Sequence, residues 1–180
     1  MKLFFISDIH GSIEDLNKAL TIFEKEKANY LIILGDILYH GPRNPLPLNY
    51  NPQEVVKKLN PYKEKIIAVR GNCDSEVDQM LLDFPIMSDF SQILLDNKRF
   101  FLTHGHIYNE NSLPPLGKND ILCHGHTHIL QAVKKESVII FNPGSITFPK
   151  EDNQKSYGIY EKNSLSIFSL EGELIKKLEI

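Results

Sequence analysis

The sequence has few cysteines, no long apolar segment and no block of basic residues, and each absence excludes a class of protein. Two cysteines in 180 residues are too few to hold a fold together by disulfides, and free thiols suit a reducing cytosol. No apolar run approaches the roughly 20 residues that cross a bilayer. The apolar stretch at residues 3–6 is too short for the hydrophobic region of a secretory signal. We therefore expect a cytoplasmic protein.

The charge of the chain excludes two further classes. The formal net charge is −3 and the sequence pI is about 6.2. These values argue against a protein that binds nucleic acid or a membrane surface, so we expect neither a membrane nor sequence-specific nucleic acid as a partner. The proportions of hydrophobic residues (42%) and charged residues (24%) are ordinary for a globular protein. A chain of this length predicts a single domain over residues 1–180.

Three short apolar segments, each followed by a polar loop, organise the first half of the chain. They cover residues 3–6, 30–34 and 65–70, and their composition is typical of strands buried on both faces. Between the first two segments, Ile13, Leu16, Leu20 and Phe23 recur at helical spacing, and Ser12 is placed to cap that helix. The proline-rich segment 40–52 predicts a surface loop, and residues 53–59 predict a short helix.

The second half of the chain has a different pattern, with short strands joined by polar turns. Residues 92–103 indicate a hairpin, and further strands are expected at 121–123, 138–141, 157–160, 165–168 and 174–178. The alternation of strands and helices in the first half is typical of a layered α/β fold, in which ligands bind beyond the carboxyl ends of the strands. We predict two packed β-sheets with helices outside.

Most of the histidines lie where the predicted strands end. Six of the seven occur in the segments Asp8-Ile-His10, His104-Gly-His106 and His124-Gly-His126-Thr-His128. An aspartate and an asparagine follow the second and third strands. The resulting candidate ligands are Asp8, His10, Asp36, Asn72, His104, His126 and His128. A lone histidine is more often a hydrogen-bonded polar residue than a ligand, but five such loops together indicate a metal centre.

The mixture of ligand types narrows the choice of metal. Imidazole and carboxylate groups without cysteine pairs suit Mn, Fe, Co, Ni or Zn and disfavour a structural zinc site. Seven ligands are too many for one tetrahedral ion and suit two ions that share a carboxylate. Two divalent ions against two aspartates leave a positive site, which favours a bridging hydroxide and an anionic substrate. Two ions about 3.5–4 Å apart can hold the attacking and leaving oxygens of a phosphoryl displacement.

The ordered set Asp8-x-His10, Gly35-Asp36, Gly71-Asn72, His104 and Gly125-His126-x-His128 resembles the motif pattern of the calcineurin-like metallophosphoesterases over nearly the whole chain. The resemblance implies a four-layer α/β/β/α sandwich, a two-metal centre that uses Mn, and hydrolysis of small phosphodiesters. It further implies that the first metal is held by Asp8, His10, Asp36 and His128. Asp36 then bridges to the second metal, which Asn72, His104 and His126 complete. The expected catalytic residues are Asn72, His104, Arg70 and Cys73.

Cys73 departs from that family pattern. Many relatives place a histidine after the motif asparagine, where it helps to protonate the leaving group. A thiol with an ordinary pKa of about 8.5 replaces imidazole poorly near pH 7, so we expect good leaving groups to be favoured, and Cys73 to be a packing residue as the alternative. Arg70, beside the metal loop, is expected either to contact phosphate or to pair with Asp74. Arg43 in the proline-rich loop is a candidate for the substrate entrance.

Two other functions stay open from the sequence. A phosphomonoesterase or nucleotidase uses the same centre, but a monoester dianion calls for more basic contacts than Arg43 and Arg70 supply. The resemblance also includes a protein-interaction scaffold, a retromer subunit with an impaired metal site, whereas the ligand set of this sequence is complete. The same resemblance favours a homodimer or a higher homo-oligomer.

Overall fold

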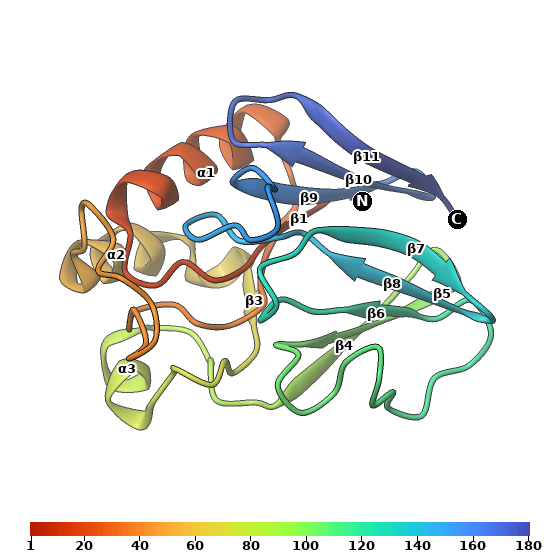
Figure 1. The fold of residues 1–180 in the computed structure, drawn as a ribbon, viewed down its shortest axis with the longest axis horizontal. Helices are drawn as coiled ribbons and strands as arrows, with labels where there is room; N and C mark the ends of the chain where they lie inside the picture. Colours follow the sequence, from red (N-terminus) through yellow and green to blue (C-terminus); the bar gives the residue numbers. More distant parts are fainter.

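The computed structural model describes residues 1–180 and contains two mixed β-sheets, one above the other in Figure 1. The first sheet has the strand order β11 (Leu174–Glu179), β10 (Ser164–Ser169), β9 (Ser156–Glu161), β1 (Leu3–Ile6), β2 (Tyr30–Ile33) and β3 (Ile66–Ala68). The second has the order β4 (Phe90–Leu95), β5 (Lys98–Thr103), β6 (Ile121–Cys123), β8 (Val138–Asn142) and β7 (Gln131–Lys135). Strands β1, β2 and β3 are parallel, and so are β5, β6 and β8.

Side chains of the central strands alternate between two cores. In β1, Phe4 and Ile6 pack toward the helices, whereas Leu3 and Phe5 pack into the layer between the sheets. Phe100 of β5 and Phe141 of β8 fill that layer from the second sheet. Because both faces of β1 are buried, its sequence is continuously apolar, as predicted for such strands.

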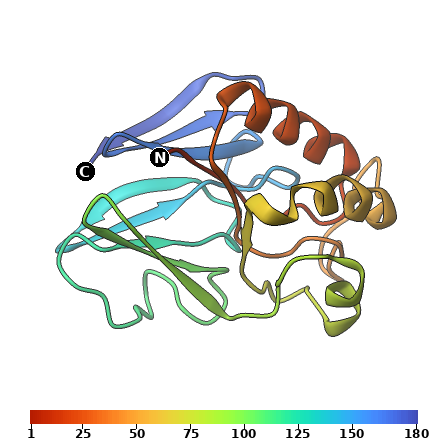
Figure 2. The same cartoon turned by 180° about the vertical axis from the view of Figure 1, so that it is seen from behind.

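The helices lie together on the side of the molecule away from the chain termini (Figure 2). They are α1 (Ile13–Glu26), α2 (Pro52–Leu59) with the 3₁₀ turn η1 (Asn60–Lys65), and α3 (Glu76–Leu81). Helix α1 buries Leu16, Leu20 and Phe23 on the first sheet, which confirms the predicted helical spacing. No helix combines the length and the apolar character needed to cross a membrane.

Ser12 precedes α1 as expected, but its hydroxyl does not cap the helix. The Ser12 hydroxyl donates to Asp15 Oδ2 at 2.6 Å, and no side-chain bond reaches the backbone of the first turn. Asp15 is buried and accepts from Lys155 Nζ at 2.7 and 2.8 Å. The hydroxyl hydrogen is thus donated to a carboxylate, which is a strong acceptor, while the Ser12 oxygen accepts nothing from the N–H groups of the first turn.

The outer face of the second sheet is covered by a segment of turns instead of a helix. Residues 104–120 contain no helix, and Tyr108 and Leu116 from this segment pack on a small cluster around Phe101. The expectation of two packed sheets with helices is confirmed, but the fourth layer is built from this loop. The adjacent Pro114 and Pro115 prevent a helix there because each removes a backbone donor.

Besides the 3₁₀ turn η1, two elements were not expected from the sequence. Strand β7 has the composition QAVKK, and its last two residues are exposed lysines, so it lacks an apolar alternation. Helix α3 is only six residues long and buries none of them. It begins at a capping box in which Ser75 Oγ accepts from the backbone of Asp78 and the Asp78 carboxylate accepts from the backbone of Ser75. Both elements are too short to show the hydrophobic periodicity from which longer strands and helices are predicted.

Candidate metal centre

Loops at the carboxyl ends of parallel strands from both sheets meet at one place. From the first sheet, Asp8 and His10 follow β1, Asp36 follows β2 and Asn72 follows β3. From the second sheet, His104 follows β5, and His126 and His128 follow β6. The distances below connect these side chains, so the structure brings together all seven predicted ligands. Both sheets are therefore needed to build the site.

Four of these side chains, those of Asp8, His10, Asp36 and His128, form a first cluster around the buried atoms Asp8 Oδ1 and His10 Nε2. Asp8 Oδ1 lies 3.2 Å from His128 Nε2 and 3.7 Å from His10 Nε2. Asp36 Oδ2 lies 3.7 Å from the same His10 nitrogen. Asp8 Oδ1 and His10 Nε2 are buried and have no hydrogen-bond partner. Burying unpaired acceptors is costly, so this cluster fits a cation that would contact both atoms.

A second cluster forms around His104. Its Nε2 atom lies 3.4 Å from Asp36 Oδ2, 3.1 Å from Asn72 Oδ1 and 3.2 Å from His126 Nδ1. Two ring nitrogens, an amide oxygen and a carboxylate oxygen thus surround one point. Asp36 Oδ2 belongs to both clusters, which is the arrangement expected of a bridging carboxylate.

Backbone carbonyls fix the orientation of three of the histidines. The Nδ1 atoms of His10, His104 and His128 lie 2.9, 2.6 and 2.6 Å from the carbonyl oxygens of Tyr39, Leu34 and Phe148. A carbonyl oxygen only accepts, so each Nδ1 carries a hydrogen. In the neutral ring, the lone pair is then on Nε2, which points into the cluster. This is the support that metal-bound histidines require.

The electrostatics of the site hold its carboxylates in the charged form. Burial alone would raise the pKa of Asp8, but the adjacent His128 ring and the charge of His104 lower it well below its usual range. Burial lowers the pKa of His104, yet the Asp36 hydrogen bond and the Asp8 charge raise it to about 9. For His126, burial and the charge of His104 lower the pKa to about 4. Charged carboxylates beside imidazoles are a ready cation site.

The ligand loops have an unusual backbone. Asp8, His10, Asp36, His126 and His128 all adopt positive φ values between 49° and 65°. This left-handed region is uncommon for residues other than glycine, and it costs about 1–3 kcal/mol per residue where strain is stored. Five such residues among seven candidate ligands indicate that the surrounding packing holds the loops in a shape that serves a site.

Asp74 is a supporting residue that the sequence did not reveal. Its carboxylate accepts the backbone N–H groups of Asp36 (2.8 Å), Ile37 (2.8 Å) and Gly71 (2.7 Å). It thereby ties the loop after β2 to the loop after β3. Burial raises the pKa of Asp74 to about 6. The predicted pairing with Arg70 is wrong, since Arg70 forms no ion pair and the Asp74 oxygens are taken by backbone donors.

A cleft of about 380 Å³ opens over the two clusters. Its floor includes Asp36, Asn72, His126 and His128, and its walls include Gly41, Pro42, Arg43, Asn44, Cys73, Thr127 and Lys150. The expectation that Arg43 lies at the substrate entrance agrees with this lining, whereas Arg70 does not line the cleft. Lys150 was not predicted as a site residue because it lies in the loop after β8, and this loop contains no candidate ligand.

Cys73 packs against the cleft wall. Burial, together with the nearby negative charge of Asp36, raises the pKa of the Cys73 thiol to about 12. A Cβ atom on Gly41 would lie only 3.0 Å from Cys73 Sγ, so the two residues are in close contact. Its backbone N–H donates to Asp36 Oδ1 at 2.8 Å. The geometry favours the packing role over a proton-transfer role.

The sequence and the structure assign the chain to a known family. The model of the calcineurin-like phosphoesterase superfamily domain matches residues 1–164. The chain therefore belongs to the calcineurin-like phosphoesterase superfamily.

Within that family, the chain is very similar to phosphodiesterase YfcE of Escherichia coli K12. The two are 50% identical over 175 residues, which cover 97% of this chain and 95% of that protein. A solved structure of YfcE, described as a phosphoesterase from E. coli, matches with a TM-score of 0.99 over 100% of both chains at 49% identity. The match to this relative therefore includes all of the loops that carry the candidate ligands.

More distant relatives share the fold. A phosphodiesterase of Methanocaldococcus jannaschii is 29% identical over 151 residues, or 80% of this chain and 83% of that protein. The structure of vacuolar protein sorting 29 from Cryptosporidium parvum matches with a TM-score of 0.68 at 19% identity, covering 99% and 98% of the two chains. At that identity the likeness concerns the fold alone.

Proposed function

We propose that this protein is a metal-dependent phosphodiesterase with a two-metal centre. Asp8, His10, Asp36 and His128 would hold one ion, and Asp36 with Asn72, His104 and His126 would hold the other. The observation that carries the proposal is the convergence of seven side chains on two points that share Asp36 Oδ2. The extensive identity to a protein named phosphodiesterase supports the choice of substrate class.

The residues of the chain prepare the site for an anionic substrate. When bound, two divalent ions supply Lewis acidity that activates water and neutralises charge on phosphate. Asp8 and Asp36 stay ionised because their pKa values are held low against the effect of burial. Asn72 supplies an amide oxygen, which suits Mn, and the imidazoles also accept Zn, Fe, Ni or Co. We propose manganese as the metal that supports turnover.

Cys73, which follows the motif asparagine, is not poised to protonate the leaving group near neutral pH. The Cys73 thiol, with a pKa of about 12, lies far from the range in which a general acid works best. Arg70 is outside the cleft lining, so we assign it no contact with the phosphate. The proposed reaction therefore favours esters whose alcohol leaves readily without help.

The test uses metal-stripped protein titrated with manganese. Hydrolysis of bis(4-nitrophenyl) phosphate and of 4-nitrophenyl phosphate is followed side by side, and bound metal is counted in the same samples. We expect diester turnover to require metal, to reach its maximum at two ions per chain, and to exceed monoester turnover. Both esters release 4-nitrophenol, so the comparison does not depend on the leaving group; they differ in charge and in the second aryl group of the diester.

Each other outcome favours a different function. Preference for the monoester would assign the chain to the phosphatases. Absence of turnover with either ester, despite two bound ions, would favour a protein-interaction scaffold such as the sequence left open. Full turnover with a single bound ion would overturn the two-metal centre while leaving the phosphodiesterase in place.

A further inference from the structure

Two basic side chains line the cleft without an acidic partner. Arg43 and Lys150 are both exposed, and neither forms an ion pair with an acidic residue of the chain. The ion pairs of the protein involve other basic residues, for instance Lys155, which pairs with Asp15. Their position at the mouth of the metal site makes these two charges available to an anionic group of a ligand.

The backbone holds Arg43 at a defined place on the cleft wall. It occupies a turn in which the Asn44 N–H donates to the Gly41 carbonyl at 3.3 Å, and Pro42 stands at the second position. Proline suits that position because its φ angle is already fixed. The turn is anchored at both ends, since Gly41 packs on Cys73 and the Asn44 side chain donates to the His40 carbonyl at 2.8 Å.

Lys150 is tied to the metal centre through a different loop. Its backbone N–H donates to the carbonyl oxygen of His128 at 3.1 Å. Two residues earlier, the Phe148 carbonyl accepts from His128 Nδ1 at 2.6 Å. The Lys150 carbonyl accepts from the Asn153 backbone at 3.2 Å, which closes the turn that follows. The segment 148–150 therefore fixes both a candidate ligand and the Lys150 backbone.

A substrate with a single phosphodiester group would leave the positive charges of Arg43 and Lys150 unbalanced. Two divalent ions would balance Asp8, Asp36, one phosphodiester monoanion and a hydroxide nucleophile. Arg43 and Lys150 then remain as two extra positive charges. The cleft lining contains no Phe, Tyr or Trp on which a base could stack.

We propose that Arg43 and Lys150 bind a second anionic group of the substrate, so that the preferred substrates are phosphodiesters carrying a further phosphate. This inference rests on the proposed function of the same cleft. Guanidinium and ammonium groups bind phosphate oxygens by charge-assisted hydrogen bonds, and the guanidinium does so in a bidentate manner. Selection then acts on the charge of the substrate and not on the identity of a base.

The test compares two substrates that differ only in that phosphate. One is thymidine 5′-(4-nitrophenyl phosphate), and the other is its 3′-phosphorylated counterpart; both release 4-nitrophenol. We expect kcat/KM to be about tenfold higher for the 3′-phosphorylated substrate, a difference of ~1.4 kcal/mol, mainly through KM. The preference should shrink with added salt, because exposed charges are screened over a Debye length of about 8 Å at physiological ionic strength.

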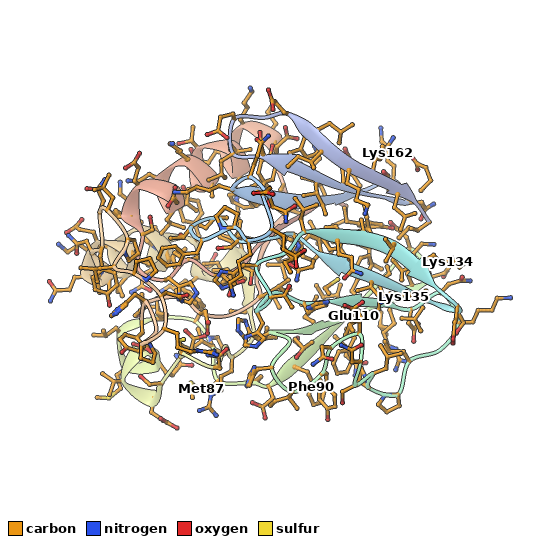
Figure 3. The ribbon with its side chains drawn as sticks, viewed as in Figure 1. Met87, Phe90, Glu110, Lys134, Lys135 and Lys162 are labelled. Carbon is orange, nitrogen blue, oxygen red and sulfur yellow. The ribbon has the colours of Figure 1, made fainter.

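Variants assign the preference to the two side chains. Arg43→Gln and Lys150→Gln should each lower the ratio of the two kcat/KM values, and the double variant should bring it close to one. The matched control is Lys162→Gln, in the turn between β9 and β10 next to the C-terminal strand (Figure 3). That turn is anchored by the Ile180 N–H, which donates to the Asn163 carbonyl at 2.8 Å. The control should keep the ratio of the unsubstituted protein.

A binding measurement separates this inference from the proposed function. Titration calorimetry compares thymidine 3′,5′-bisphosphate with thymidine 5′-monophosphate. Tighter binding of the bisphosphate, lost in the double variant, supports the second anion site even if neither ester is hydrolysed. Equal kcat/KM values and equal affinities in the unsubstituted protein would overturn the inference, while turnover of both esters would leave the phosphodiesterase standing. A preference that survives in the double variant would also overturn it.

Discussion

His104 is the residue on which the second cluster depends. Its Nε2 atom is within 3.4 Å of oxygen or nitrogen atoms from Asp36, Asn72 and His126. We expect His104→Ala to keep the fold, to lose one of two bound ions, and to lower kcat/KM for an aryl phosphodiester by more than about a hundredfold. Even residues that only support a metal ligand cost roughly 10–100-fold when replaced. Metal counting by mass spectrometry and steady-state kinetics check this prediction.

The matched control for that variant is a histidine outside the clusters. The ring of His40 packs against Tyr39 and Tyr50 and does not line the cleft. His40→Ala should therefore retain two ions and most of the turnover. Normal turnover of His104→Ala with one ion would contradict the two-metal centre.

The pKa of His104 predicts how metal affinity depends on pH. In the metal-free protein, burial lowers this pKa, but Asp36 and Asp8 raise it to about 9, so the ring is protonated at pH 7.5. An incoming ion has to displace that proton, and the apparent affinity for manganese should rise with pH up to about 9, by about tenfold per pH unit for one displaced proton. His126, with its pKa lowered to about 4, is already neutral and releases none.

Calorimetric titrations in buffers of different ionisation enthalpy measure that proton directly. We expect His104 to account for about one released proton at pH 7.5 and for less above pH 9, in addition to the proton lost by water that the ions activate. The His104→Ala variant should release about one proton fewer than the unsubstituted protein at pH 7.5. An affinity that does not change between pH 6 and 9 would show that His104 is not protonated in the metal-free site.

The protonated thiol of Cys73 predicts a strong dependence on the leaving group. With a pKa of about 12, it contributes little as an acid, so the rate should fall steeply as the pKa of the departing alcohol rises. Cys73→His should flatten this dependence and raise the rate for poor leaving groups at least about tenfold, because a well-placed general acid supplies about 10²–10⁴-fold and a newly introduced imidazole need not reach the best geometry. A series of substituted phenyl diesters measures the slope; a flat slope in the unsubstituted protein would reveal another proton donor.

At the scale of elements, the loops after β2 and β3 approach each other so closely that one position tolerates only glycine. A Cβ atom on Gly71 would overlap the Asp36 carboxylate and backbone nitrogen. We expect Gly71→Ala to weaken manganese binding at least about tenfold and to lower the free energy of unfolding by about 1–3 kcal/mol, as overpacking does. Denaturant unfolding with and without metal separates the two effects.

Gly117 provides the comparison for that substitution. It lies in the loop that covers the second sheet, where a Cβ atom would come no closer than 3.3 Å to the Asp120 side chain. Gly117→Ala should leave metal affinity unchanged. Equal loss of affinity in both variants would mean that the effect of Gly71→Ala is a general loss of stability and not a displacement of Asp36.

At the scale of the whole molecule, the site joins the two sheets. Asp8 and Asp36 extend from the first sheet, whereas His104 and His128 extend from the second. Metal binding should therefore stabilise the folded chain, by about 2.7 kcal/mol at a hundred times the dissociation constant. Scanning calorimetry should show Tm rising with the logarithm of manganese concentration and falling when a chelator is added. A Tm independent of manganese would contradict binding to the folded site, and His104→Ala should show a weaker dependence.

The sequence by itself determined the strands and the order of the site loops. Runs such as residues 3–6 and 30–34 are apolar because both faces of those strands are buried, and polar residues begin where each strand ends. Since parallel strands end at one edge of a sheet, the residues after β1, β2 and β3 necessarily lie close together. The seven candidate ligands could therefore be named without coordinates.

Only the tertiary structure decided what surrounds those residues. Lys150 reaches the cleft because its backbone binds that of His128, and Asp74 accepts three backbone donors, two of them from a loop nearly forty residues away. The raised pKa of Cys73 comes from burial against Gly41 and Asp36. Local sequence patterns indicate which faces of a strand or helix are buried. The burial, electrostatic potential and hydrogen bonds at the site depend on segments distant in the sequence, and these segments meet only when the two sheets pack.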